Sequence, residues 1–285
     1  MKKRNRIYLV VAILVLTSFA KKADEESGHS ITLKMLKKTS GISSLIYTLS
    51  KEERIEGKMI KQISFTKMEK EPFRVYMKQL YPQEGMEVLF VEGEHNNKAI
   101  INPNGFPWVN IKLHPKEGIM RNDQHHTIYQ SGFDHVVSIL DYLVKKYESD
   151  MDTMVKYNGI VQHDNKDCHS VSFTNPNFKY IDYTVQENET LETIAAKFKL
   201  SEHMILEKNH KVKHYDDVSV GQVIQIPNDY SPKMMLYIDK DALIPLRMDV
   251  YDDQGLYEKY QYSKVTIDPK LDPSEFSQDY SAYGF

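Results

Sequence analysis

Two histidine-containing pairs are the residues whose types and spacing most directly suggest chemistry. His125 and His126 are adjacent, and Cys168, the only cysteine, is followed directly by His169. Imidazole and thiolate groups are common zinc ligands, and a cysteine beside a histidine could form a nucleophile–base pair. A metal site needs three or four converging ligands, however, and neighbouring residues on a strand point to opposite faces. We therefore predict solvated loop histidines, an inert strand cysteine and no metal site.

An acidic cluster offers a second candidate for chemistry. Glu52, Glu53 and Glu56 could supply the carboxylate pair of a glycosidase. They stand where a strand is expected to enter a hairpin turn, so we predict solvated turn residues instead. The sequence contains no Gly-rich phosphate loop, no Gly-x-Ser-x-Gly and no His-Glu-x-x-His. We expect a non-enzymatic protein with no catalytic residue and no cofactor.

Residues 183–227 form the best-defined unit that could position a binding site. After a short alternating strand, four apolar residues recur on one helical face, namely Leu191, Ile194, Ala195 and Phe198. Thr190 stands before them as an N-cap, and Thr193 is not expected to complete a capping box. A second helix at 201–208 and a strand at 223–226 complete a β-α-α-β module.

This module resembles a LysM domain along its whole length. The matching positions are Tyr183, Val185, Thr190, Leu191, Ile194, Ala195, Phe198, Leu206, Asn209, Gly221, Ile224, Ile226 and Pro227. The resemblance implies binding of N-acetylglucosamine-containing glycans, above all peptidoglycan. Carried over by position, the implied glycan-binding residues are Asn188, Glu189, Thr190, Leu191, Asn209 and His210. Asn188-Glu189 replaces the family's Gly-Asp pair and His210 its usual proline, and the alternative is a structural or protein-docking insert.

The remainder of the chain predicts an antiparallel sheet with helices. Apolar or alternating runs predict strands at 45–47, 60–65, 73–78, 88–91, 99–101, 108–111, 154–157, 160–162, 169–173, 234–238, 246–250 and 256–265. Apolar residues at helical spacing predict a helix over 133–147 and a shorter one within 24–41. Because strand character continues on both sides of the module, we expect the module to interrupt one sheet, with its own two ends close together.

Outside the module, the chain resembles the domain of unknown function 1571 family of bacterial envelope proteins, which are related to LolA-like lipoprotein carriers. The resemblance lies in residues 53–57, 72–78, 85–93, 250–255 and 283–285. It implies an α+β fold, a curved antiparallel half-barrel covered by helices, whose hollow could admit a lipid or lipoprotein. The lipid-facing candidates are Phe73, Val75, Met77, Leu89 and Val91. The alternative is a filled core in a scaffold protein that docks protein partners.

The N-terminus predicts export. Residues 1–20 combine four basic residues, an apolar run and a small-x-small ending, which is typical of a secretory signal, and an uncleaved anchor stays open as the alternative. Without them, 33 basic residues face 40 acidic ones, so nucleic acid is not an expected partner. We expect a protein of the bacterial periplasm or cell envelope, with a half-barrel over 21–180 and 229–285 and a LysM domain over 181–228.

Overall fold

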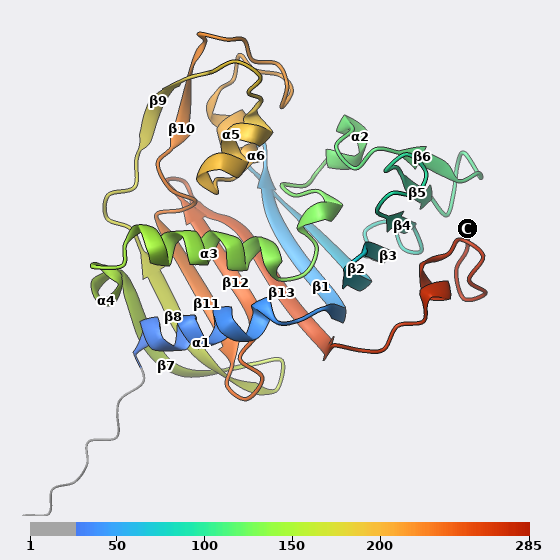
Figure 1. The fold of residues 1–285 in the computed structure, drawn as a ribbon, viewed down its shortest axis with the longest axis horizontal. Coiled ribbons are helices and arrows are strands. Elements are labelled where there is room, and N and C mark those ends of the chain that lie inside the picture. The colour runs from blue at the N-terminus through green and yellow to red at the C-terminus, as the bar shows by residue number, and fades with distance from the viewer. Residues whose placement is uncertain (1–26) are drawn as a thin grey trace, which may run out of the picture.

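The computed structural model describes residues 27–285, in which a long antiparallel sheet carries helices on one face (Figure 1). The predicted signal at 1–20 lies outside these residues. The sheet is open, with the strand order β6-β5-β4-β3-β2-β1-β13-β12-β11-β8-β7. Its strands are β1 (Ser44–Ile55), β2 (Lys58–Lys70), β3 (Phe73–Tyr81), β4 (Glu87–Val91), β5 (Ala99–Asn102), β6 (Ile111–Leu113), β7 (Val155–His163), β8 (Lys166–Thr174), β11 (Lys233–Asp239), β12 (Pro245–Asp252) and β13 (Gly255–Ile267).

A small module separates two neighbouring strands of this sheet. β8 pairs with β11 from Thr174↔Lys233 onward, so the chain leaves the sheet after Thr174 and re-enters it beside the same residue. The module consists of β9 (Tyr180–Thr184), α5 (Leu191–Phe198), α6 (Glu202–Lys208) and β10 (Val223–Pro227), and β9 and β10 pair with each other. The backbone N–H of Asn228 donates to the Lys179 carbonyl at 2.9 Å, which holds the two ends together. The prediction that the module interrupts one sheet is therefore confirmed.

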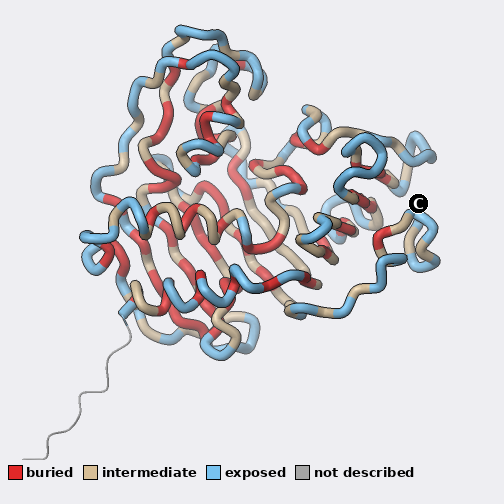
Figure 2. The backbone as a smooth tube through the Cα atoms, viewed as in Figure 1, coloured by how far each residue is buried: buried red, intermediate tan, exposed pale blue. Residues whose placement is uncertain are grey.

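Helices α1 (Gly28–Ser40) and α3 (Asp134–Lys146) lie across one face of the sheet (Figure 1). The buried residues of α3 fall on one side, at Val136, Ile139, Leu140 and Leu143, because helical neighbours recur every three to four positions. They pack in the main hydrophobic core with residues from most strands of the long sheet, β1 and β13 included. The α+β class and the curved sheet covered by helices are as predicted. Figure 2 shows the buried stretches concentrated in the strands beneath these helices.

The bounds of some elements differ from the prediction: β1 runs on through Glu53, and the strands predicted at 154–157 and 160–162 are the single strand β7. The strand predicted at 108–111 is the shorter β6, and Trp108 lies before it in a loop with 79 % of its surface exposed. Shorter helices in this region are α2 (Gly118–Arg121), η1 (Ile128–Gln130) and α4 (Met151–Met154). None of the helices within 27–285 combines the length and the apolar character that crossing a membrane would need.

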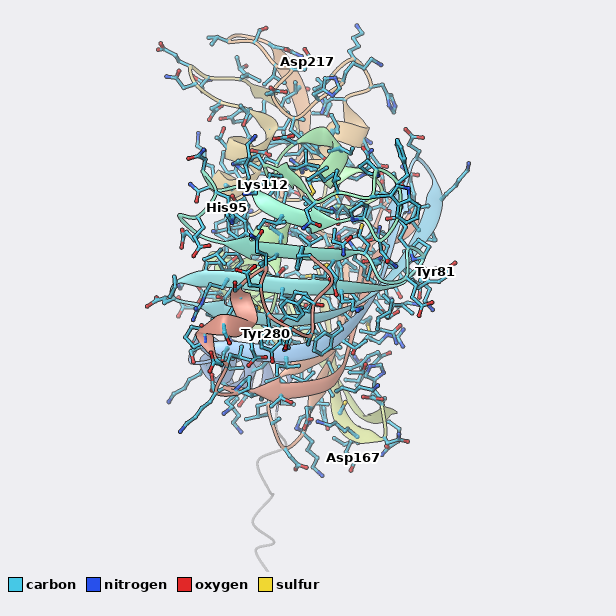
Figure 3. The ribbon with its side chains drawn as sticks, turned by 90° about the vertical axis from the view of Figure 1, so that its right-hand side faces the viewer. Tyr81, His95, Lys112, Asp167, Asp217 and Tyr280 are labelled. Atoms are coloured by element: carbon cyan, nitrogen blue, oxygen red, sulfur yellow. The ribbon has the colours of Figure 1, made fainter. Side chains whose placement is uncertain are left out.

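The opposite face of β3, β4 and β5 is covered by the end of the chain. Tyr76 of β3 stacks on Tyr283 with 3.6 Å between ring centroids, and Phe276 of η2 (Pro273–Phe276) packs beside them. Figure 3 shows the segment that carries Tyr280 lying in front of these strands. This part of the sheet is therefore sandwiched, with apolar residues on both of its faces.

Candidate functional site

The inserted module has a hydrophobic core of its own, formed by both of its helices and both of its strands. Thr190 caps α5, and Thr193 forms a capping box with it. The Thr193 N–H donates to Thr190 Oγ1 at 3.3 Å, while the Thr190 N–H donates to Thr193 Oγ1 at 2.8 Å. The expectation that Thr193 completes no capping box was wrong, because a threonine hydroxyl here fills the place that a Glu or Gln carboxyl or amide usually takes.

A groove of about 790 Å³ opens between the module and the sheet domain. We call it the composite groove, because both parts of the chain line it. The module contributes Thr190, Glu192, His203, Leu206, Lys213, His214, Tyr215 and Asp216, and the other wall consists of Ile55, Glu56, Lys116, Glu117, Gly118, Arg121, Asn122 and Asp123. In Figure 1 the module helices α5 and α6 face α2 across this region.

Arg121, at the end of α2, fastens the two walls of the composite groove together. Its guanidinium pairs with Glu192 Oε1 at 2.6 Å and also with Glu202, and it lies 3.3 Å above the centre of the Tyr215 ring. Only 3 % of the Arg121 side chain is exposed. Burial raises the pKa of Glu202, and the charge of Arg121 opposes that rise. A planar, permanently charged group suits this double role of pairing and stacking.

Beneath the composite groove lies a buried His–Glu cluster, which we define as Glu53, His125, His126, Tyr230, Glu258 and Tyr260. Glu258 accepts hydrogen bonds from Tyr230 Oη at 2.6 Å and from Tyr260 Oη at 3.2 Å. The single Tyr260 hydroxyl proton is shared with Glu53, whose carboxylate oxygen lies closer to it. The prediction of solvated residues was wrong for both Glu53 and His125, whose exposed fractions are 1 % and 0 %. Their burial depends on Glu258, which stands far away in the sequence.

His125 is a buried cation. Its Nδ1 lies 2.9 Å from Glu258 Oε2 and its Nε2 lies 3.0 Å from the carbonyl oxygen of Arg54. Both partners are acceptors, so both ring nitrogens carry a proton. Burial alone would lower the pKa of His125, but the hydrogen bond to Glu258 and the charge of Glu53 raise it on balance. Burial likewise opposes ionisation of Glu53, while the charges of Lys51 and His125 bring its pKa down to about 2.

Two further histidines surround the cluster. His135 of α3 stands with its ring 4.6 Å from that of His126, and burial lowers the pKa of His135 to about 3. His203 of α6 stacks on His125 with 4.5 Å between ring centroids. Because His203 also lines the composite groove, the cluster lies directly below the floor of that groove.

The Cys168–His169 pair does not form a catalytic dyad. Cys168 is fully buried in the main core, and burial raises the pKa of its thiol to about 11. His169 turns instead to the Tyr157 hydroxyl, with 3.3 Å from Nδ1 to Oη. Cys168 lies in β8, as predicted, and the raised pKa favours a neutral thiol, which is a weak nucleophile.

Comparison with known families decides what this chain resembles. A family model described as "Protein of unknown function (DUF1571)" matches residues 42–191, which is more than half of the chain. The chain belongs to the DUF1571 family. A second model, that of the LysM domain, matches residues 183–227. No curated protein matches the chain significantly.

Three solved structures illustrate what the chain is similar to over most of its length. One is a DUF1329 family protein from Desulfovibrio piger, with 12 % identity over 90 % of this chain and 98 % of that one and a TM-score of 0.35. Another is the Mycobacterium tuberculosis lipoprotein LppX, with 10 % identity, coverage of 86 % and 97 % and a TM-score of 0.41. A LolA superfamily protein from Nitrosomonas europaea has 10 % identity, coverage of 89 % and 99 % and a TM-score of 0.31.

The predicted glycan-binding residues of this DUF1571 chain have different surroundings within the LysM domain. Asn209 is committed to the fold, since its Nδ2 donates to the carbonyls of Ile205 and Gln225 at 2.7 and 2.8 Å and its Oδ1 accepts from Gln225 N at 2.9 Å. Glu189 accepts from the Tyr183 hydroxyl at 2.8 Å and from the Gln186 N–H at 2.9 Å.

The other four predicted glycan-binding residues also differ in their surroundings. Leu191 is fully buried in the module core. Asn188 and His210 are exposed, and Thr190 is the one of the six that lines the composite groove. The wall from outside the module was not predicted, because nothing in the local sequence shows that Arg121 meets Glu192.

The five predicted lipid-facing residues do not share one surface. Val75 is in the main core, and Phe73 and Met77 pack against that core. Leu89 and Val91 belong to the cluster on the opposite face, below the C-terminal segment. The reason is the register, since Val75 pairs with Phe90 and neighbouring residues of a strand alternate between faces.

Proposed function

We propose that this protein is a non-enzymatic binding protein of the cell envelope that holds an N-acetylglucosamine-containing glycan, peptidoglycan above all, in the composite groove. The observation that supports this most is that the LysM match spans the whole module and that both of its loops, at Thr190 and at 213–216, open into a groove of about 790 Å³. That volume lies in the range of pockets that hold small ligands, about 300–1,000 Å³.

The groove offers the groups that a sugar with N-acetyl substituents needs. Lys213, His214 and Asp216 are exposed polar side chains, and Leu206 supplies an apolar contact. Hydroxyl and amide groups of a glycan can exchange hydrogen bonds with the former while apolar atoms cover a sugar face. Lys116 and Asn122 would add contacts from the opposite wall. The glycan would thus lie between the LysM domain and the DUF1571 sheet.

Pelleting with insoluble peptidoglycan tests the proposal. We expect the chain without residues 1–20 to pellet with the glycan, and the double variant Lys213→Ser/His214→Ala to bind at least about tenfold more weakly, because two net hydrogen bonds contribute about 1 kcal/mol each. The matched control is Lys211→Ser/Val220→Ala, which changes exposed residues of the same module outside the groove. The proposal fails if the wild type stays in the supernatant or if the two double variants bind equally.

A lipid or lipoprotein ligand for the half-barrel is the second candidate, and it rests on the apolar layer between α3 and the sheet. A cavity there, lined by Leu140, Leu143, Phe173 and neighbouring residues, measures about 10 Å³, which is room for at most about one water molecule. An acyl chain would enter only if α3 moved away from the sheet. Native mass spectrometry after incubation with fatty acid should then show a lipid adduct. A spectrum without an adduct would favour a filled scaffold that docks protein partners.

A further inference from the structure

Three side chains of the His–Glu cluster come from separate elements and point toward one position. Glu53 is on β1, Glu258 is on β13, and His126 is in the segment between α2 and η1. One ligand atom from each lies within 4.8 Å of the other two. We propose that Glu53, His126 and Glu258 bind a divalent transition-metal ion of the zinc or manganese type.

The spacing and the donor types fit such an ion. His126 Nε2 lies 3.3 Å from Glu258 Oε2. Two ligand atoms that bind one zinc ion at about 2.0–2.2 Å in tetrahedral geometry stand roughly 3.5 Å apart. Imidazole nitrogen with carboxylate oxygen is a donor set that zinc and manganese accept. The Tyr230 hydroxyl, 3.4 Å from His126 Nε2, or a water molecule could complete the coordination.

A second observation concerns two buried ring nitrogens. His126 Nδ1 and His135 Nε2 have no hydrogen-bond partner among the described residues, although both atoms are buried. Leaving such atoms unpaired is costly. If His126 binds a metal ion through Nε2, its Nδ1 carries the proton and can turn toward the lone pair of His135, whose ring is 4.6 Å away. Metal-bound histidines usually donate their second ring N–H to an acceptor in this way.

The charge at the position suits a cation, because two carboxylates meet there. Glu53 and Glu258 are two buried carboxylates, and without a metal ion they are balanced by Lys51, 3.1 Å from Glu53, and by the His125 cation. A divalent ion held between the two carboxylates would contact both of them at once, and carboxylate oxygen is a ligand that manganese and zinc accept.

The position of the site gives the ion a structural role. The segment that carries His126 follows directly on α2, whose last residue, Arg121, fastens the LysM domain. His203 of that domain stacks on His125 directly above the ligands. A bound ion would tie this segment to β1 and β13 and so stiffen the wall of the composite groove. The inference does not depend on what the groove binds.

Equilibrium dialysis of chelator-treated protein lacking residues 1–20 against ZnCl2 and MnCl2 tests the site. Wild type is expected to bind one ion per chain. His126→Gln removes a ligand and should bind at least about tenfold more weakly, because losing a group that only supports a metal ligand already costs about 10–100-fold in affinity. His135→Gln should weaken binding by about tenfold. His169→Gln removes a buried histidine elsewhere and should bind like wild type.

Failure of the wild type to bind a stoichiometric ion, or equal binding by His126→Gln and His169→Gln, would overturn the proposal. If His126→Gln does not fold, the absorption of the wild type with Co2+ decides instead. Intense visible bands of a near-tetrahedral site support the proposal, and a spectrum equal to that of free Co2+ overturns it.

Discussion

Replacing Glu258 with glutamine should lower the free energy of unfolding by about 3–5 kcal/mol, the usual cost of breaking a buried ion pair by removing one partner. Glutamine keeps the shape of the side chain and removes its charge, so the His125 cation, with none of its side chain exposed, loses the carboxylate 2.9 Å away. The measurement is urea unfolding at neutral pH in the presence of a chelator, which keeps metal binding out of the comparison.

Glu52→Gln is the control for this variant. Glu52 is on β1 beside Glu53, but its partner Lys259 is 3.2 Å away and both side chains are partly exposed. Exposed ion pairs contribute about 0–1 kcal/mol. The double variant Glu258→Gln/His125→Gln should recover part of the loss, since it removes the unpaired cation. Equal unfolding midpoints for Glu258→Gln and Glu52→Gln would show that the pair between Glu258 and the His125 cation does not stabilise the fold more than a partly exposed ion pair does.

The contacts within the His–Glu cluster could not be predicted from the sequence. Periodicity predicted the strand that carries Glu258 and the helix that carries His135, because these patterns are local. It placed Glu53 in a turn after a strand at 45–47, whereas β1 continues to Ile55. It could not show that β1 pairs with β13, which brings Lys51 opposite Tyr260. One local signal was present. Glu258 stands on the same face of its strand as Tyr260 and Tyr262, and a charge on an apolar face indicates a buried partner.

The LysM domain was predictable for the opposite reason. Its pairing strands, caps and core lie within residues 180–227, so the local pattern contains nearly the whole fold. The roles of single residues were less accessible. Asn209 was expected to contact a glycan, yet its three backbone hydrogen bonds join α6 to β10. A family pattern marks positions that the fold needs as well as positions that a ligand needs.

Replacing Arg121 with methionine should release the LysM domain from the sheet without unfolding it. The substitution leaves Glu192 and Glu202 without their shared partner and removes the cation from the Tyr215 ring. We expect a loss of about 3–5 kcal/mol in docking, because the Arg121 side chain is almost wholly buried. The domain keeps its own core, so hydrogen exchange should rise in 116–126 and in the strands entering the module while α5 stays protected.

Arg247→Met provides the matched control. Arg247 forms a two-bond pair with Asp249 and lies over Tyr237, but this pair is local to β12 and its arginine is 28 % exposed. Its loss should cost at most about 1 kcal/mol and leave exchange in 116–126 unchanged. If Arg121→Met gives the exchange pattern of Arg247→Met, Arg121 does not hold the domain in place.

The Arg121 variant also separates two forms of the glycan site. If the sheet domain supplies one wall of the site, as the composite groove indicates, undocking the LysM domain should weaken pelleting with peptidoglycan by the contacts that Lys116 and Asn122 supply. If the domain binds alone, pelleting should be unchanged or stronger, because the second wall then only restricts access. Measuring pelleting and hydrogen exchange on the same preparation distinguishes these two forms of the site. An undocked domain with unchanged glycan binding would show that the sheet domain is not part of the glycan site.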